Sequence, residues 1–263
     1  MQLGGAQENV DQVRSGTIFG TWIGIAYLSR TVPELEAVSL PFVFSDRETA
    51  FRVIDGEVGD LLNAKLAEKG YVSLGYMELG SRHVTNNIRP IESAKDFEGL
   101  KIRLQPNETH LATFRAIGAN PVPMGIQEVY SALQQGVLDG QENPYSVIAT
   151  RRFDEVQKYL SDSGHFFDFI ILVANKDAFD QLLPEQQEAV RAAAAKAIEW
   201  QRAKATEEDT AARETLIERG MQFDPLSPEV RPELQERTAG VVDELRAKIG
   251  GEIIDAVLSE AGS

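Results

Sequence analysis

Residues 98–144 constrain the fold of this chain more than any other stretch. Two segments in it carry apolar residues at helical spacing, and each ends at a glycine. Short apolar or proline-punctuated runs flank them. The order is therefore strand, helix, strand, helix and strand, over Lys101–Leu104, Glu108–Ile117, Asn120–Met124, Gln127–Gln135 and Val137–Gly140. This alternation predicts a parallel sheet whose strand ends face one crevice.

Arg103 stands near the end of the first of these strands, among apolar neighbours. A guanidinium has five N–H donors in a planar fork, a shape that suits a carboxylate held by two parallel hydrogen bonds. An arginine in this position can equally form a structural salt bridge with one of the many Asp and Glu residues. From spacing alone the structural role is the commoner one. The residues by themselves therefore leave two interpretations, an anion site and a structural ion pair.

The chain has 263 residues, a formal net charge of −15 and no cysteine. This length is enough for one large or two modest α/β domains with their own cores. The negative charge argues against binding to nucleic acid or anionic membranes, because like charges repel. An anionic ligand would need arginines that reverse the field inside a cleft. The lack of cysteine excludes disulfides and thiol catalysis.

Hydrophobic periodicity predicts further elements outside the central stretch. One amphipathic helix is expected over Arg47–Lys69, and a long helix is expected over Pro184–Arg219. Pro184 suits the first turn of that helix, and Gly220 suits the position after its end. Two strands and a turn are expected at Tyr71–Leu79, Ile170–Ala174 and Thr85–Asn87.

Four segments resemble, in order and spacing, the motifs of the DctP-type substrate-binding proteins of TRAP transporters (tripartite ATP-independent periplasmic transporters). That family carries a GLKIR-like strand, a GANPVPM-like turn, an EVYxALQxGxxDGQENP-like helix and turn, and an LPxxxQ-type helix start. The counterparts here are Gly99–Arg103, Gly118–Met124, Glu128–Pro144 and Leu183–Gln187. Four linked motifs across most of the chain form a much more specific signal than any one of them.

The resemblance implies an α/β, two-lobed fold like that of periplasmic binding proteins, with two crossing strands and a long helix that spans both domains. Domain I is expected to comprise residues 1–81 and 169–208, and domain II residues 82–168 and 209–263. Gln2–Gly5 is similar to a turn that in the family follows a first strand, helix and second strand. The resemblance thus implies that these elements and an export signal lie before the sequence given, and that domain I exposes apolar surface without them.

In the family, the arginine at the position of Arg103 forms the salt bridge to the ligand carboxylate, which favours the anion-site interpretation. Arg82 resembles a second arginine of the cleft, and Asn143 in the GQENP turn is expected to contact the ligand. Trp22 and Tyr27 are expected at the cleft wall, although packing in the core is the commoner role of such aromatic residues.

Phe167 and Asp168 lie at the second expected crossing and are further candidates for lining the cleft. Ile126 is at a position where some sialic-acid-binding relatives carry an aromatic residue, and Gly24 at one where they carry an acid. Both departures argue against sialic acid, so a smaller organic acid or a sugar acid is expected. His83 is interpreted as an ordinary hydrogen-bonded or exposed histidine.

The resemblance implies an extracytoplasmic solute-binding protein that takes a C4-dicarboxylate, sugar acid or other organic acid into an interdomain cleft. It would deliver this solute to the membrane permease subunits of a TRAP transporter. A periplasmic location and a monomer are implied, with no cofactor and no nucleic acid. His165 has two carboxylates nearby, but no second histidine follows at a suitable spacing, so no metal site is expected.

Two other classes of protein are alternatives to this interpretation. One is an α/β enzyme acting on a small organic acid, and the other is an interaction module that uses an exposed sheet edge. The sequence has no nucleophile-elbow pattern, no phosphate-binding GxxxxGK[ST] loop and no GxGxxG after a strand. Its carboxylates lie mainly on the polar faces of predicted helices, where solvation is their usual role.

Overall fold

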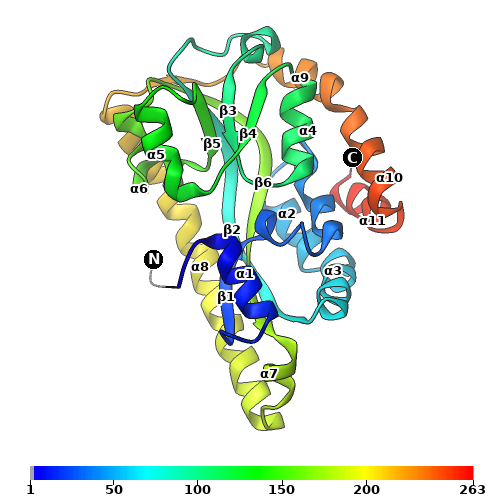
Figure 1. The fold of residues 1–263 in the computed structure, drawn as a ribbon. Helices are drawn as coiled ribbons and strands as arrows, with labels where there is room; N and C mark the ends of the chain where they lie inside the picture. Colours follow the sequence, from blue (N-terminus) through cyan, green and yellow to red (C-terminus); the bar gives the residue numbers. More distant parts are fainter. Residues whose placement is uncertain (1–2, 263) are drawn as a thin grey trace.

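The computed structural model describes residues 3–262. Its strands form one mixed seven-stranded sheet in the order β1-β6-β2-β5-β3-β4, with β7 paired to β6 (Figure 1). The pairs that β3 makes with β4 and β5 are parallel, as the alternating pattern predicts. The strands are β1 (Gly20–Gly24), β2 (Tyr71–Asn86), β3 (Lys101–Leu104), β4 (Asn120–Pro123), β5 (Gly140–Asn143), β6 (Tyr159–Asn175) and β7 (Gln222–Asp224).

Helices cover the sheet in both lobes (Figure 1). The first lobe holds α1 (Ala6–Arg14), η1 (Ile25–Tyr27), η2 (Pro33–Ser39), α2 (Arg47–Ile54), α3 (Glu57–Glu68) and α7 (Lys176–Asp180). The second holds η3 (Ala94–Phe97), α4 (Glu108–Ala116), α5 (Ile126–Gln134), α6 (Tyr145–Thr150) and η4 (Phe153–Glu155). The chain ends with α8 (Pro184–Glu218), α9 (Val230–Thr238), α10 (Gly240–Ile249) and α11 (Glu252–Ala261).

The two long strands β2 and β6 run antiparallel to each other through both lobes. Their register pairs Tyr71 with Asn175 at one end and Asn86 with Tyr159 at the other. It shifts at three places, including the steps Glu78/Gly80 and Arg82/Val84. Such irregularities locally bend and twist a paired strand. The crossing between the lobes is therefore a continuous ladder with bends in it.

Three apolar cores stabilise the molecule. The first is built on β6 and the helices of the first lobe, with Phe44, Leu62 and Phe169 among its members. The other two lie in the second lobe. One joins β3 and α4 to α9, with Ile102 and Phe114, and the other joins α5 and α6 to α8. The sheet of the second lobe is thus the middle layer between two helical layers.

The long helix α8 contacts both lobes, as the sequence predicts, and has 35 residues. In the first lobe the Gln201 amide accepts from the Glu78 N–H and donates to the Glu78 carbonyl, at 2.9 Å each. In the second lobe Ala212 and Leu216 lie in the apolar core with α5 and α6. The helix is therefore fixed by polar contacts in one lobe and by apolar packing in the other.

The C-terminal helices divide differently from the expected domain boundaries. Although residues 209–263 were assigned to domain II, Ile254 and Val257 of α11 are fully buried in the first core, beside α2 and α3. α9 packs in the second lobe, where Leu234 joins the core of α4. The exact division of the chain between domains stays a proposal, but its last helix packs on the first lobe.

Three local predictions were wrong. The strand expected over Val137–Gly140 is β5, which starts only at Gly140 and runs to Asn143. The expected single helix over 47–69 is two helices, because the chain turns at Gly56 and Gly59 lies against Ile54. A Cβ at Gly59 would be 1.9 Å from the Ile54 carbonyl oxygen. Thr85 and Asn86 are not in a turn, because they belong to β2, which pairs with β5 on one side and β6 on the other.

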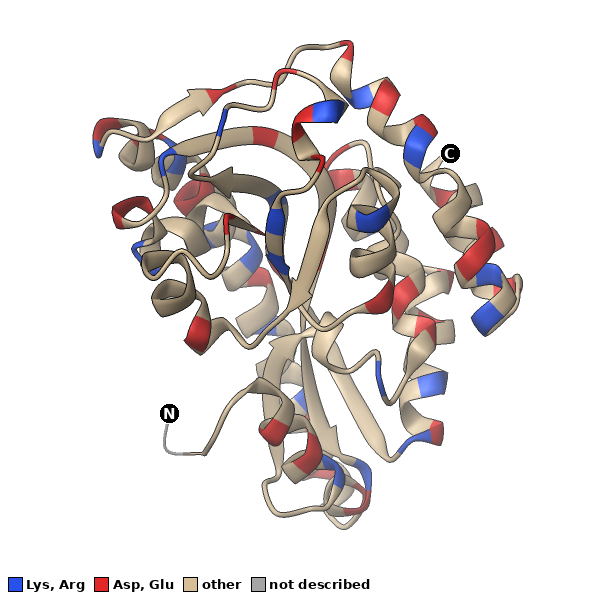
Figure 2. Cartoon of the chain, turned by 45° about the horizontal axis from the view of Figure 1, so that its top comes forward, with Lys and Arg blue, Asp and Glu red and all other residues tan. Residues whose placement is uncertain are grey.

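Acidic residues are spread over the outer helices of both lobes rather than gathered on one of them (Figure 2). This distribution fits the solvated role expected for most of the carboxylates. Within residues 3–262, no helix combines the length and the apolar character needed to cross a bilayer.

Candidate functional site: the cleft between the lobes

A cavity of about 930 Å³ lies between the lobes. The first lobe contributes residues of α1, β1 and η1, and the second contributes the ends of β3 and β5 and the starts of α5 and α6. The lining residues with polar groups that matter below are Tyr27, Arg103, Gln105, Asn143, Ser146 and Thr150. Because the carboxyl ends of β3 and β5 meet here, the cavity is at the crevice predicted for this sheet.

Arg103 is fully buried at the bottom of this cavity. Its Nε and Nη2 donate to the Met124 carbonyl at 2.9 and 2.6 Å, and Nη2 also lies 3.3 Å from the Tyr27 hydroxyl. These contacts fix the plane of the guanidinium. Nη1 has no hydrogen-bond partner, and Arg103 forms no ion pair within residues 3–262. The Nη1 group is therefore a buried donor without a partner, on a residue that lines the cleft.

This arrangement is costly without an anion. Burial lowers the pKa of Arg103, since the charged form is taken out of water, and Tyr27 and Glu142 oppose that shift. A buried charge that lacks a partner typically costs several kcal/mol, so proteins usually pair it. The site thus favours the binding of a carboxylate or another oxyanion at Nη1.

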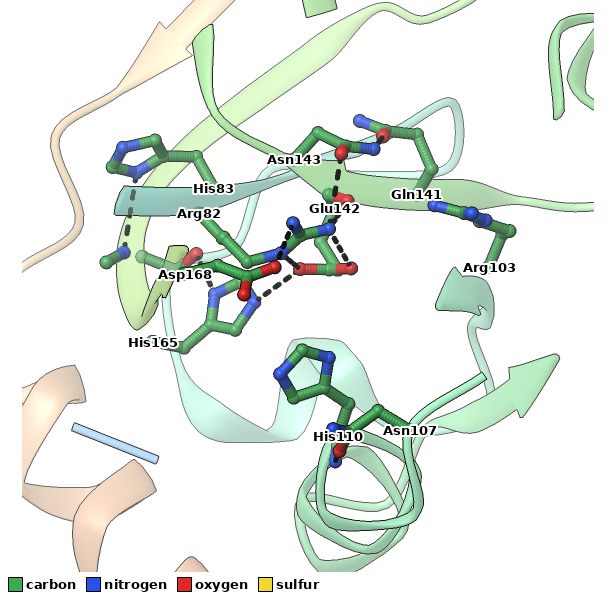
Figure 3. A network of polar contacts seen from close by, with 12 residues as sticks. Arg82, His83, Arg103, Asn107, His110, Gln141, Glu142, Asn143, His165 and Asp168 are labelled. Atoms are coloured by element: carbon green, nitrogen blue, oxygen red, sulfur yellow. Dashed lines mark hydrogen bonds and ion pairs between the residues drawn. The ribbon is translucent and has the colours of Figure 1, made fainter. Parts of the chain in front are cut away.

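Arg82 is held in a network of buried charges (Figure 3). Its Nε and Nη2 donate to the two carboxylate oxygens of Glu142 at 2.5 and 2.7 Å, and Nη1 donates to Asp168 Oδ2 at 3.1 Å. All three side chains are almost completely inaccessible. Arg82 does not line the cavity, which differs from the expectation, because these carboxylates already hold its guanidinium.

The same network shifts the pKa values of its carboxyl groups in opposite directions. Burial would raise the pKa of Glu142, but Arg82 and His165 together hold it well below the usual range. Burial raises the pKa of Asp168 to about 6, because Arg82 only partly compensates for it. His165 is hydrogen-bonded on both sides: its Nδ1 lies 2.8 Å from Ser163 Oγ, and its Nε2 lies 3.2 Å from Glu142 Oε2. Burial lowers the pKa of His165. Glu142 is the carboxylate that stays charged.

The structure brings some of the other sequence-predicted residues to the cleft. Asn143, Ile126 and Trp22 line it, and so does Tyr27. The Asn143 amide is engaged at both ends, accepting from Arg82 at 3.2 Å and donating to Gln141 at 2.5 Å. The Trp22 side chain is exposed to the extent of 66%. It is therefore accessible to a ligand and not part of the core.

Phe167 and Asp168 lie elsewhere. Phe167 packs edge-on against Phe44, Phe51 and Phe169 in the first core, with ring centres 5.4–6.5 Å apart. Asp168 points to Arg82. Neither residue lines the cleft.

Sequence reasoning missed Gln105, Ser146 and Thr150 in the lining of the cleft, and it also missed the buried His110 nearby in the second lobe. Gln105 lines the cleft, and its Oε1 is buried without a partner. It follows Arg103 by two residues, so strand alternation could have placed both on one face. His110 is fully buried, and its ring is stacked on Phe166 at 4.0 Å. Burial lowers the pKa of His110 to about 3, so this side chain is neutral. No local pattern marks it.

Residues 3–262 contain no cluster of three or more His, Cys, Asp or Glu side chains arranged for a metal ion. His165 faces Glu142 and Ser163 and not the two aspartates that flank it in the sequence.

Known proteins with this sequence pattern and fold are solute-binding proteins. The family model of the bacterial extracellular solute-binding proteins, family 7 (DctP), matches residues 1–248. The 2,3-diketo-L-gulonate-binding periplasmic protein YiaO of Escherichia coli K12 is 38% identical over 84% of the chain and 67% of that protein. A solute-binding protein of Verminephrobacter eiseniae is 37% identical over 83% of the chain and 65% of that protein.

The fold matches solved structures more completely. The crystal structure of the sugar acid binding protein DctPAm from Advenella mimigardefordensis, in complex with galactonate, superposes with a TM-score of 0.96 at 35% identity. It covers 99% of this chain and 84% of that one. The two-lobed α/β fold expected from the sequence is thereby confirmed.

The chain belongs to the family 7 (DctP) bacterial extracellular solute-binding proteins. Its matched segment spans about two thirds of the length of the curated relatives named above.

Proposed function

We propose that this chain is the extracytoplasmic solute-binding protein of a TRAP transporter and binds a carboxylate-containing solute between its lobes. The observation that carries the proposal is Arg103. It is buried, oriented by the Met124 carbonyl, and has an unpartnered Nη1, and it lines a cavity of about 930 Å³. A ligand carboxylate at Nη1 would neutralise this charge and complete its hydrogen bonds.

The solute is an organic acid, and a sugar acid fits the lining best. Hydroxyl and amide groups line the same cavity as the arginine, supplied by Tyr27, Gln105, Ser146 and Thr150. These groups suit a ligand that carries hydroxyls beyond its carboxylate. The relatives named above bind 2,3-diketo-L-gulonate and galactonate. A C4-dicarboxylate is the competing ligand, and its second carboxylate would have to reach Arg151 at the exposed rim.

The proposal has three further parts. The protein is located in the periplasm, is a monomer, and releases the solute to membrane permease subunits. These parts rest on membership of the family. Light scattering of the purified chain measures the monomer directly, and a dimer mass would contradict that part alone.

Mass spectrometry of the molecule that co-purifies with the chain tests the function, followed by calorimetry with galactonate and succinate. Arg103→Lys keeps the charge but loses one of two parallel hydrogen bonds, so affinity should fall about ten- to a hundredfold. Arg103→Ala should weaken binding further, because the ligand carboxylate is then desolvated without a partner. Equal affinities for wild type and Arg103→Ala would refute the proposal, and turnover of the acid would favour an enzyme instead.

A further inference from the structure

A second cavity, of about 310 Å³, shares no lining residue with the cleft. Its walls come from the loop before α2, from the crossing part of β2 and β6, and from Arg231 on α9. Phe44 and Phe167 in its wall belong to the core of the first lobe, and Phe166 belongs to a core of the second. A molecule bound here would therefore contact both lobes.

Arg231 is the charged group that this cavity leaves unpaired. It is half-buried, and its guanidinium lies 5.1 Å from the centre of the Phe42 ring. Within residues 3–262 it makes no ion pair. Burial lowers its pKa, and the only opposing contribution comes from Asp162. The guanidinium nevertheless stays charged, as arginine does at any ordinary pH.

Two donors converge on one space beside Gly164. A Cβ built on Gly164 would lie 3.4 Å from Arg231 Nη1 and 3.6 Å from Ser81 Oγ. Ser81 lines the cavity and has no hydrogen-bond partner for its hydroxyl among the described residues. A glycine at this place leaves room for a small group in contact with both donors.

The other charged groups of the wall are already engaged. Arg47 holds both carboxylate oxygens of Glu78, at 2.8 and 3.0 Å. Asp46 accepts from the Thr49 N–H at 2.7 Å as the cap of α2. Asp162 pairs with His83 Nδ1 at 2.9 Å.

The two aspartates nevertheless limit the charge and size of an anion in this cavity. Among the charged side chains that line this cavity, Arg231 is the one without an ion-pair or hydrogen-bond partner within residues 3–262.

We propose that this second cavity binds a small oxyanion, held by the Arg231 guanidinium and the Ser81 hydroxyl at the junction of the lobes. The bound anion would join α9 to the crossing strands. The volume is at the lower end of the roughly 300–1,000 Å³ of ligand pockets, which suits an inorganic oxyanion or a short carboxylate. The site is separate from the cleft and does not depend on the function proposed for it.

Calorimetric titration with inorganic phosphate, in an Arg103→Gln background that disables the cleft arginine, tests the site. Arg231→Gln should weaken phosphate binding about ten- to a hundredfold, the effect of losing a charge-assisted hydrogen bond. Arg231→Lys keeps the charge and should weaken phosphate binding less than Arg231→Gln does. Arg237→Gln is the matched control, because it removes the same charge from the same helix. Arg237 pairs with Glu98 and Glu233 and lies outside the cavity wall.

A parallel titration with acetate distinguishes the sources of the anion. Tighter binding of phosphate identifies an inorganic ligand, and tighter binding of acetate identifies a carboxylate. An anomalous peak beside Arg231 in crystals soaked in selenate would support the site directly. Failure of both anions to bind the Arg103→Gln background, or equal losses in Arg231→Gln and Arg237→Gln, would overturn the proposal.

Discussion

The Arg82 guanidinium and the Glu142 carboxylate form a two-point ion pair between the adjacent strands β2 and β5, with both side chains fully buried. Arg103, on the neighbouring strand β3, is equally buried but has no carboxylate partner. The second lobe thus contains two buried arginines, of which the protein neutralises only one. This contrast leads to the first two predictions.

Glu142→Gln should destabilise the ligand-free protein by about 3–5 kcal/mol, because Arg82 would keep its buried charge and lose its main partner. Urea unfolding monitored by circular dichroism measures this change. Asp180→Asn is the control, since its ion pair with Lys176 is exposed and should contribute little. A loss for Glu142→Gln no larger than for the control would show that the pair is not needed for folding.

Arg103→Met and Arg82→Met should have opposite effects on ligand-free stability. Arg82→Met leaves Glu142 and Asp168 as unpaired buried carboxylates and should lower the midpoint of unfolding sharply. Arg103→Met removes a buried charge that has no ion pair, so the midpoint should stay or rise while ligand binding is lost. Thermal melts without ligand compare the two. A large loss in Arg103→Met would make Arg103 a structural residue.

The pH dependence of stability should contain two opposing contributions. His110 has a folded pKa of about 3, below its ordinary 6.5, so the unfolded chain binds the extra proton between these values and stability is lost as the pH is lowered through this range. The pKa of Asp168 is about 6 in the folded protein, above its ordinary 3.8. Between these values the folded state binds the extra proton, so the contribution of Asp168 to stability rises as the pH is lowered. Each slope is roughly 1.4 kcal/mol per pH unit.

Single variants separate these contributions. Relative to wild type, His110→Phe should gain stability as pH falls from 6 to 4, and Asp168→Asn should lose it. Unfolding free energies at pH 6, 5 and 4 give the slope of stability against pH for each protein. Comparison of these slopes removes any constant difference in stability between the variants. Parallel curves for all three proteins would contradict the assignment of these protons.

Gln201→Ala should cost about 1–3 kcal/mol, because the N–H and C=O of Glu78 lose their partner where the β2 register shifts. Lys196→Ala, at an exposed position on the same helix, should leave stability unchanged. Denaturant midpoints of the two variants are compared directly. Equal midpoints would indicate that α8 is held to the first lobe by its other contacts.

Ligand binding should change the fluorescence of Trp22 and leave that of Trp200 unaltered. Trp22 lines the cleft, and Trp200 is exposed on α8 outside it. These are the only two tryptophans in the chain, so Trp200→Phe should retain the signal change and Trp22→Phe should abolish it. A signal that survives in Trp22→Phe would place the bound molecule away from β1.

The sequence predicted the elements whose causes are local. The alternation over residues 98–144 placed the parallel strands β3 and β4 correctly and β5 about three residues too early, and Pro184 and Gly220 bracketed α8 correctly. The burial of Arg82 could not be inferred, because its partners Glu142 and Asp168 reach it only through the pairing of β2 with β5 and β6.

The packing of α11 was missed for a related reason. Apolar periodicity shows that Ile254 and Val257 are buried, but it does not show against which lobe. In the cleft, the residues alone left an anion site and a structural ion pair open, and the family resemblance favoured the anion site. The unpartnered Nη1 of Arg103 depends on the distant Met124 carbonyl and Tyr27 hydroxyl.

The ladder between β2 and β6 has a consequence for how the molecule comes apart. Two domains joined by a flexible linker can unfold one after the other, and a protease can separate them while both stay native. Here the backbone amides of Gly80–Arg82 lie in a paired stretch opposite Phe166–Asp168, between two register shifts. They can exchange with solvent, or meet a protease, only when the ladder itself opens. We therefore expect the two lobes to unfold as one cooperative unit rather than one after the other.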